Sequence, residues 1–341
     1  ELAAAVTRPK DALAFVFVVG GRAGDVGAIS SAQIGCTGSV VEREGLRGTY
    51  VLWGCIPAKA LLDAASIATK VGKAAEFGVN VGEVKLDFGV AMKRSRDVST
   101  KNSKGVEFLF KKNKITWIKG TGTIGANKSV KVVTADGKSE MLTAAKAVVI
   151  CTGSRVKGLP QAGLELNKTT VMSSDEALII EKAPKSLAIV GAGAVGCEFA
   201  DVFSAFGTKV TIIEVAPRIL PLEDEDSSSE VQRSFKKRGM EIFTGAKLSA
   251  AKIGKDSVTL TVEVGAARQD VVVERVLVAA GRAANIEGIG LKEAGVAMTD
   301  RGFIKINDAS VEELVAGVGG HQSPLLSSGR FPGLRMLLRA A

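Results

Sequence analysis

The side chains best suited to chemistry gather in residues 48–59, which read Gly-Thr-Tyr-Val-Leu-Trp-Gly-Cys-Ile-Pro-Ala-Lys. This stretch carries one cysteine, Cys55, followed by Pro57, which can open a helix, and by Lys59 one turn further on. A glycine-rich loop precedes the stretch, and a second, more regular one begins at Gly191. Loops of this kind hold dinucleotides. We therefore expect the rest of the chain to bring two nucleotides to a reactive turn around Cys55.

The second loop has a complete dinucleotide fingerprint. Gly191, Gly193 and Gly196 follow an apolar run at 187–190 that predicts a strand, and the small residues of 197–206 predict the next helix. The glycines let the backbone approach a pyrophosphate, and the helix N-terminus offers free N–H groups and the positive end of a dipole. Strand, glycines and helix in this order predict a dinucleotide site.

An acidic residue completes this second unit. Glu214 follows a predicted strand at 209–213, at a position where a carboxylate accepts ribose hydroxyls and repels a 2′-phosphate. The sequence therefore favours NAD(H) over NADP(H). Arg218 lies four residues further on, and it leaves NADP(H) open as the alternative.

The first loop follows the same plan less completely. An apolar run at 13–19 leads into Gly21 and Gly24, and the next predicted strand ends in Glu42. If these are the second and third glycines of the fingerprint, the first falls on Val19, a β-branched residue that cannot easily adopt the positive φ of glycine. The motif leaves two interpretations open: a nucleotide site, or a glycine-rich turn that holds no ligand.

The order of elements predicts an α/β protein with two Rossmann-like dinucleotide-binding domains. Between them, residues 58–73 predict a helix, and residues 87–113 predict a second one that has Asp87 as its N-cap. Residues 115–149 predict an antiparallel β-meander, which returns to a buried strand at 147–151.

Composition and charge narrow the class of protein. A hydrophobic fraction of 46% and 39 glycines fit a soluble α/β enzyme with many tight turns. The apolar runs are shorter than the roughly 20 residues of a membrane-spanning helix, so we expect no membrane segment. The net charge is +9, but the basic residues are spread out, and one Tyr and two Trp offer little base stacking. We predict a solvated basic face and no nucleic-acid partner.

The cysteines indicate a reducing compartment. They have neither the density of a disulfide scaffold nor the paired spacing of a zinc site, and they lie at Cys36, Cys55, Cys151 and Cys197. Residues 1–10 lack the pattern of a secretory signal. We expect a protein of the cytoplasm, or of an organelle matrix, without a metal site.

Together, these motifs resemble the pyridine nucleotide–disulfide oxidoreductases, a family of flavin-dependent enzymes. The resemblance covers roughly residues 18–309, and its most specific parts are 54–62 (Gly-Cys-Ile-Pro-Ala-Lys-Ala-Leu-Leu), 151–154 (Cys-Thr-Gly-Ser), 191–200, and 280–282 (Ala-Gly-Arg) with Asn285. Glutathione and mercuric reductases share the architecture. Glu214 and the Ile-Pro-Ala-Lys sequence are more similar to the dihydrolipoamide dehydrogenase branch.

The resemblance implies an FAD-binding domain at 1–153, with the turn 48–59 and the β-meander, an NAD-binding domain at 154–279, and a return to the first domain at 280–341. It implies FAD contacts by Gly21, Gly24, Glu42, Thr49, Lys59, Thr152, Gly153 and Gly319. It implies NAD contacts by Gly191, Gly193, Gly196, Glu214 and Gly281.

The same resemblance assigns catalytic roles. Glu198 matches a glutamate that pairs with the lysine at Lys59 near the flavin, where positive charge opposes the negative charge that develops on the reduced ring. Cys55 matches the cysteine that forms a charge-transfer complex with the flavin. The family's interchange cysteine, which attacks the substrate, falls on Tyr50. A phenol with a pKa of about 10 cannot form a disulfide.

Other departures concern the remaining cysteines and the C-terminal part. Cys36 is expected at a helix–strand turn on the far edge of the sheet, while Cys151 and Cys197 are expected to be packing thiols. Gly319 stands where the family has an aspartate near the flavin. His321 is expected on the surface and does not match the family's catalytic base. That base belongs to an interface domain, which we expect to be absent.

The resemblance implies oxidation of dihydrolipoamide by NAD+ through FAD. It also implies lipoyl domains of 2-oxoacid dehydrogenase complexes as partners and a homodimer as the assembly. Tyr50 argues against the thiol half of this reaction, so two alternatives stay open. One is an NADH:acceptor diaphorase, which needs neither thiol, and the other is a non-catalytic NAD-binding remnant or interaction protein.

Overall fold

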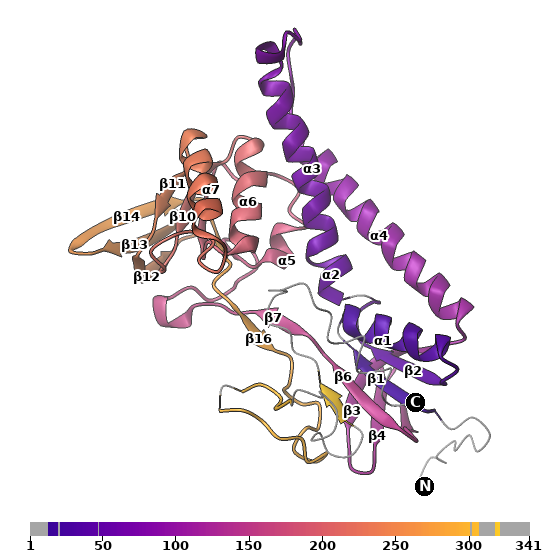
Figure 1. Cartoon of the computed structure of the whole chain (residues 1–341). Coiled ribbons are helices and arrows are strands. Elements are labelled where there is room, and N and C mark those ends of the chain that lie inside the picture. Colours follow the sequence, from indigo (N-terminus) through magenta and orange to yellow (C-terminus); the bar gives the residue numbers. More distant parts are fainter. Residues whose placement is uncertain (1–12, 20, 47, 301, 307–317, 321–341) are drawn as a thin grey trace. The chain divides into compact units, whose positions relative to one another are not determined.

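A computed structural model describes residues 13–19, 21–46, 48–300, 302–306 and 318–320 of the chain (Figure 1). The chain divides into two compact units. Unit 1 comprises Glu1–Leu52, Thr100–Arg155 and Ala284–Ala341. Unit 2 comprises Trp53–Ser99 and Val156–Ala283. Each unit contains parallel strands with helices on their faces, which confirms the predicted α/β class with two Rossmann-like units.

Unit 1 is built on a seven-stranded sheet in the order β17-β6-β1-β2-β3-β4-β5. Its strands are β1 (Phe15–Val19), β2 (Gly38–Glu42), β3 (Thr116–Ile124), β4 (Ser129–Thr134), β5 (Ser139–Thr143), β6 (Ala147–Cys151) and β17 (Val318–Gly320). β1 pairs in parallel with both β2 and β6. The parallel pairing of β1 with β2 is possible because α1 forms the crossover connection between them. The pairs β3–β4 and β4–β5 are antiparallel and form the predicted meander.

The helices of unit 1 are α1 (Arg22–Gln33), α2 (Gly48–Leu52) and the second half of α4 (Phe88–Lys112). Phe17 of β1 is buried with Ala28 of α1 and Phe110 of α4 in one apolar cluster. A Cβ atom at Gly27 would lie 2.9 Å from the Phe17 ring, so only glycine lets α1 approach the sheet this closely.

Unit 2 has a parallel sheet in the order β11-β10-β9-β15-β8 and an antiparallel sheet in the order β12-β13-β14. The strands are β8 (Val171–Met172), β9 (Ser186–Val190), β10 (Lys209–Ile213), β11 (Glu241–Phe243), β12 (Ala246–Ile253), β13 (Val258–Val264), β14 (Ala267–Val273) and β15 (Arg275–Val278). The helices are α3 (Cys55–Gly72), η1 (Ala74–Phe77), η2 (Pro160–Ala162), α5 (Ser174–Ala177), α6 (Ala194–Ala205) and α7 (Glu225–Lys237).

The helix that follows the reactive turn belongs to unit 2. α3 and α6 share one apolar cluster, in which Leu61 and Phe203 are fully buried. Phe88, at the start of α4, stacks on Phe203 with ring centroids 5.5 Å apart. This packing places residues 53–99 with 156–283, whereas the sequence grouped the turn 48–59 with the first domain. The boundary between the two compact units therefore falls inside this turn, between Leu52 and Trp53.

Side-chain caps mark the starts of α4 and α7. α4 begins at Phe88, and the Asp87 carboxylate accepts a hydrogen bond from the Val90 N–H at 3.0 Å, which confirms the predicted N-cap. Asp224 caps α7 in the same way, accepting from the Ser227 N–H at 3.0 Å. α3 begins at Cys55, three residues before the predicted start.

One described stretch, Gly48–Gly72, is long and apolar enough to cross a membrane by length and composition. Helices of protein cores pass the same test, and α3 buries residues that include Leu61, Ala65 and Ala68 inside unit 2. This feature is therefore weak support for a membrane segment.

Short strands lie where the chain passes between the units: β7 (Ser154–Val156) pairs with β16 (Arg282–Ala284). Within unit 1, Arg155 donates to both carboxylate oxygens of Glu287, at 2.7 and 2.9 Å, and to the Ala284 carbonyl at 2.9 Å. Asn285 also donates to the Thr152 carbonyl at 3.0 Å. These bonds fasten the segment 284–287 to the end of β6. The hydrogen bonds from Arg155 lower the pKa of Glu287 to about 2.

We predict that this arginine–carboxylate pair makes stability depend on pH in the acid range. The folded pKa of Glu287 is depressed, so its contribution is present above the ordinary value and is lost as pH falls from about 4.5 to about 2. Glu287→Gln should therefore lower the free energy of unfolding at pH 7, and this loss should become smaller below pH 4. Urea unfolding at pH 7 and below pH 4 measures both losses. Glu293→Gln is the control, because Glu293 is an exposed glutamate of the same unit. Equal effects of Glu287→Gln at both pH values would contradict it.

Candidate functional site

The structure places Lys59 and Glu198 together, as the resemblance implied. The Lys59 ammonium on α3 donates to the Glu198 carboxylate on α6 within unit 2. Lys59 side-chain exposure is 60% and Glu198 is 31% exposed, so solvent screens the pair and its contribution to stability is at most about 1 kcal/mol. Its value to the protein therefore lies in orientation. It fixes an ammonium group one turn after the Cys55 thiol.

Cys55 is the first residue of α3, and its thiol is exposed. Gly54 precedes it as N-cap and supplies no side-chain hydrogen bond. The thiol therefore lies at the N-terminus of an 18-residue helix, at the positive end of the helix dipole. Arg282 of unit 2 lies within electrostatic range: burial lowers the Arg282 pKa, while Asp175 and Cys55 oppose that shift.

Helix α4 fixes the first turns of α3. The buried Ser95 hydroxyl donates to the Pro57 carbonyl at 2.9 Å. Arg94 donates to the Ala60 carbonyl at 3.0 Å and pairs with Asp63 at 2.9 Å. The Arg96 guanidinium stacks over the Trp53 ring, 5.0 Å from its centroid. Sequence reasoning missed these supports, since no local pattern links α4 to the carbonyls of α3.

Tyr50 lies on α2, in unit 1, whereas Cys55 lies on α3, in unit 2. Thr49 is its neighbour on the same short helix, and both are partly buried. The position expected for an interchange thiol thus carries a phenol on a separate helix from Cys55. The described residues contain no group of three or more His, Cys, Asp or Glu side chains suited to a metal ion.

Steric contacts explain why two positions of the second loop, Gly191 and Gly196, are glycine, whereas Gly193 faces open space. Gly191 has φ of +102°, and a Cβ there would lie 2.6 Å from the Ala279 carbonyl oxygen. A Cβ at Gly196 would lie 2.0 Å from the Gly191 oxygen, so only glycine lets α6 start this close to β9. Nothing lies within 4 Å of a Cβ at Gly193, the N-cap of α6. That open side, at uncapped helical N–H groups, fits a pyrophosphate.

Glu214 stabilises this loop. Its buried carboxylate accepts from the Ala192 N–H at 2.6 Å and from the Ala216 N–H at 2.8 Å. The Cys197 thiol donates to the Ala192 carbonyl at 3.4 Å, and burial raises its pKa to about 12, which agrees with a packing thiol. Gly281 follows β15 with φ of +125°, a conformation that favours glycine.

Arg218, whose presence near Glu214 left NADP(H) as an alternative ligand, makes its hydrogen bonds and its ion pair within the connection from β10 to α7. Its guanidinium donates to the Glu223 carbonyl at 2.9 Å and to the Pro221 carbonyl at 3.4 Å. It also pairs with Glu225 at 3.5 Å. These contacts order the connection from β10 to α7 and hold the arginine there.

On unit 1, the predicted nucleotide residues gather at the carboxyl ends of β1, β2 and β6. Gly21 is the N-cap of α1 and has nothing within 4 Å of a Cβ, and the buried Gly24 lies in the first turn. Thr152 and Gly153 follow β6, and Gly319 of β17 pairs with Val149. Val19 is the last residue of β1. This edge is where α/β sheets bind nucleotides.

Glu42 is the most informative residue of this edge. Its side chain is buried, and Oε1 accepts from the Glu44 N–H at 2.9 Å. Oε2 is buried and has no hydrogen-bond partner among the residues that the structure describes. Burial raises the Glu42 pKa to about 7. A buried acceptor without a donor fits a ribose hydroxyl, so the residues present suit an FAD nucleotide.

Cys36 and Cys151 both belong to unit 1. Cys36 sits between α1 and β2, at the amino end of β2, opposite the edge that carries Glu42, as predicted. Cys151 is buried in β6, where burial raises its pKa to about 12. His321 lies outside the described residues.

Comparison with known proteins agrees with this geometry. Residues 15–318 match the family "Pyridine nucleotide-disulphide oxidoreductase". Dihydrolipoyl dehydrogenase of Mycobacterium bovis is 43% identical over 297 residues, 86% of this chain and 62% of that protein. The Bacillus subtilis enzyme of the same name is 39% identical over 303 residues, 86% of this chain and 63% of that protein. The chain thus spans about 62% of the length of these relatives.

Solved structures show the same fold. LpdA from Mycobacterium tuberculosis superposes with a TM-score of 0.82 at 22% identity, over 96% of this chain and 70% of that one. The HOCl-induced flavoprotein disulfide reductase RclA from Escherichia coli, in a Cu(II) complex, gives 0.80 at 23% identity, over 96% of this chain and 70% of that one.

Gly196→Ala should disrupt the second loop, because the new methyl group meets the Gly191 carbonyl oxygen at 2.0 Å. We expect a loss of about 1–3 kcal/mol in the free energy of unfolding and loss of NADH binding, measured by urea unfolding and by NADH fluorescence titration. Gly193→Ala is the matched control for folding, since nothing lies within 4 Å of its Cβ. If Gly196→Ala unfolds like the wild type and binds NADH equally well, the steric account of this loop is wrong.

Glu42 should make stability fall as pH rises through the neutral range. Its folded pKa is raised from 4.5 to about 7, so the folded state binds the proton more tightly and is penalised as pH increases across that window. Glu42→Gln removes the titrating group, so it should raise the free energy of unfolding of the apoprotein more at pH 8 than at pH 5. The difference between the two effects should be about 3 kcal/mol at most. Urea unfolding at both pH values measures this. A Glu42→Gln effect that does not change with pH would contradict the assignment.

Proposed function

Because the chain belongs to the pyridine nucleotide–disulphide oxidoreductase family, we propose that it is a flavin-dependent, NAD-linked oxidoreductase of the dihydrolipoyl dehydrogenase type. The observation that carries this proposal is the Lys59–Glu198 ion pair. It joins the helix of the reactive turn to the helix of the second glycine loop. An ammonium held in this way serves a reaction in which negative charge develops nearby.

FAD would be held on unit 1 by the N-terminus of α1 at Gly21 and Gly24, with the open Glu42 oxygen accepting a ribose hydroxyl. Thr49, Thr152, Gly153 and Gly319 belong to the same expected contact set. When bound, FAD supplies the two-electron redox chemistry that no side chain provides. The protein's contribution is to bind it, to orient it and to hold the Lys59 charge.

NAD would be held on unit 2 by Gly191, Gly193 and Gly196 at the start of α6. Glu214 places the backbone of this loop, and its negative charge disfavours a 2′-phosphate. The engagement of Arg218 inside its own loop supports the same preference. NAD(H) rather than NADP(H) is therefore the proposed pyridine nucleotide.

The thiol chemistry of this chain would rest on Cys55 alone. Its exposed thiol begins α3 one turn before Lys59, so it is available to react. Tyr50 offers no second sulfur, and an intramolecular disulfide at this turn needs one. This substitution favours a second candidate function, an NADH:acceptor diaphorase, which transfers electrons to a quinone or dye without a thiol step.

The relatives are named dihydrolipoyl dehydrogenases, and the proposed substrate of the complete reaction is dihydrolipoamide. Lipoyl domains of 2-oxoacid dehydrogenase complexes and a second copy of the chain are the proposed partners. A cytoplasmic or organelle-matrix location, which suits free thiols, belongs to the same proposal.

Two assays separate the candidates after the purified chain has been loaded with FAD. We predict that NADH supports reduction of a dye such as dichlorophenolindophenol, that NADH-driven lipoamide reduction is absent, and that Cys55→Ser keeps the dye reaction. Tyr50→Cys adds one thiol, which should form a disulfide with Cys55 on oxidation in air. Addition of NADH to the FAD-loaded variant should reduce this disulfide and return two thiols, counted by thiol titration. NADH-driven lipoamide reduction by the wild-type chain would contradict the interpretation of Tyr50. A colourless protein that binds NADH would point to the non-catalytic alternative.

A further inference from the structure

Helix α1 of unit 1 carries a buried acid in its first turn. Asp25 is 1% exposed, and it shares the buried face of the helix with Ala28 and Ser31. Ala28 belongs to the apolar cluster that joins this face to Phe17 of β1. A carboxylate adds nothing to such apolar packing, and its removal from water costs free energy.

The two glycine loops of this chain differ at the position of this acid. β1 ends at Val19 and β9 ends at Val190, so the sixth residue after the strand is Asp25 in unit 1 and Gly196 in unit 2. A Cβ atom at Gly196 would lie 2.0 Å from the Gly191 oxygen, so the loop of unit 2 requires glycine there. Where the second loop has no side chain, the first loop has a carboxylate.

The strand ends around α1 locate the Asp25 carboxylate. Val19 pairs with Glu42 of β2 and with Cys151 of β6, so these three residues lie side by side at the carboxyl edge of the sheet. Cys151 is within electrostatic range of Asp25: burial raises the pKa of the thiol to about 12, and the negative charge of Asp25 adds to the rise. Helical side chains lean toward the N-terminus of their helix, so the carboxylate of Asp25 lies toward the first N–H groups of α1.

These N–H groups are the ones proposed to receive the FAD pyrophosphate. A helix N-terminus attracts an anion through its free N–H groups and its dipole, and an acidic side chain in the first turn already supplies one. The phosphates then meet a like charge, and the repulsion is stronger at a buried edge than in water. Glu42 lies at the same edge and is itself an acid, so it offers no compensating positive charge.

We propose that the negative charge of Asp25 limits the affinity of unit 1 for FAD, because it repels the pyrophosphate at the N-terminus of α1. The inference rests on the FAD site of the proposed function and adds the residue that controls its occupancy. The NAD loop belongs to unit 2, and its affinity for NADH is independent of Asp25.

Flavin fluorescence titration of the full-length apoprotein with FAD tests the proposal. Asp25→Asn keeps the size of the side chain and removes its charge, so it should lower the dissociation constant for FAD by about tenfold or more. Asp25→Gly should have a similar effect. All variants retain Arg22, the other charged residue of this turn, so the comparison isolates the charge at position 25.

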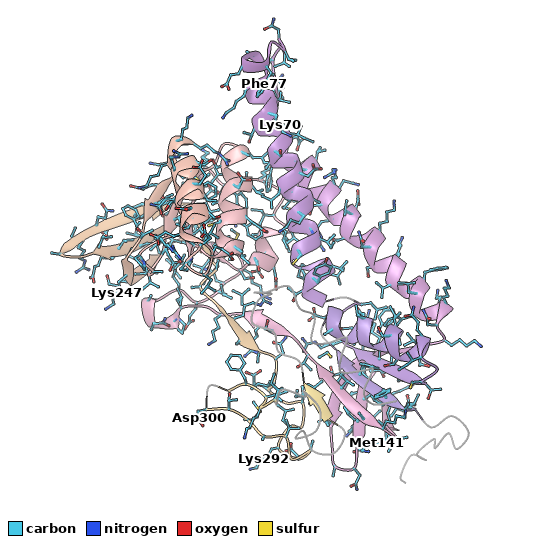
Figure 2. All side chains as sticks on the ribbon, viewed as in Figure 1. Lys70, Phe77, Met141, Lys247, Lys292 and Asp300 are labelled. Atoms are coloured by element: carbon cyan, nitrogen blue, oxygen red, sulfur yellow. The ribbon has the colours of Figure 1, made fainter. Side chains whose placement is uncertain are left out.

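Glu140→Gln is the matched control, because it removes a negative charge elsewhere in unit 1. Glu140 is exposed on β5, the edge strand of the same sheet, next to Met141, which is labelled in Figure 2. This variant should bind FAD like the wild type. NADH fluorescence titration should give one dissociation constant for the wild type and Asp25→Asn. Near-UV circular dichroism and urea unfolding verify that all variants fold.

Three results would overturn the proposal. Equal FAD affinity of the wild type and Asp25→Asn removes the role of Asp25 and leaves the proposed FAD site in place. A gain in affinity in Asp25→Gly alone assigns the limit to the size of the side chain, and the charge is then excluded as its cause. If FAD binds neither the wild type nor either Asp25 variant, unit 1 has no FAD site, and the proposed function fails together with this inference.

Discussion

The Lys59–Glu198 ion pair joins residues 139 positions apart in the sequence, and the functional account depends on it. It connects the first turn of α3, which carries the exposed Cys55, to the first turns of α6, which follow the glycine loop. The pair is too exposed to contribute much stability. The apolar packing of α3 on α6 supplies that stability, and the pair then sets the position of one ammonium group beside one thiol.

The two predicted nucleotide loops differ in whether the described residues donate hydrogen bonds to both oxygens of the acidic side chain at the end of the second strand. Both carboxylate oxygens of Glu214 accept from backbone N–H groups, so the second loop is ordered by the chain itself. Glu42 has one buried oxygen without a donor in the described part of the chain, and burial raises its pKa to about 7. The first loop therefore gains more from a ligand that donates a hydroxyl, and its cofactor should stabilise the fold more strongly.

Local patterns predicted much of this structure. Apolar runs and glycine spacing gave β1, β9 and α6, and Asp87 gave the start of α4. The sequence did not predict that α3 packs with unit 2, because that depends on Leu61 and Phe88 meeting α6 residues more than 100 positions away. The Arg155–Glu287 ion pair was missed for the same reason, since it joins residues 132 positions apart and leaves no short-range signal. Lys59–Glu198 was predicted only because a family resemblance supplied the pairing.

Under the proposed function, one chain uses two dinucleotides in a single redox reaction. Anaerobic titration of the FAD-loaded chain with NADH, followed by the visible flavin absorbance, tests it most directly. The account predicts that one equivalent of NADH bleaches one bound flavin, and that Glu198→Gln slows the bleaching while the flavin stays bound. A bound flavin that NADH does not bleach, or bleaching that is equally fast in Glu198→Gln, would contradict it.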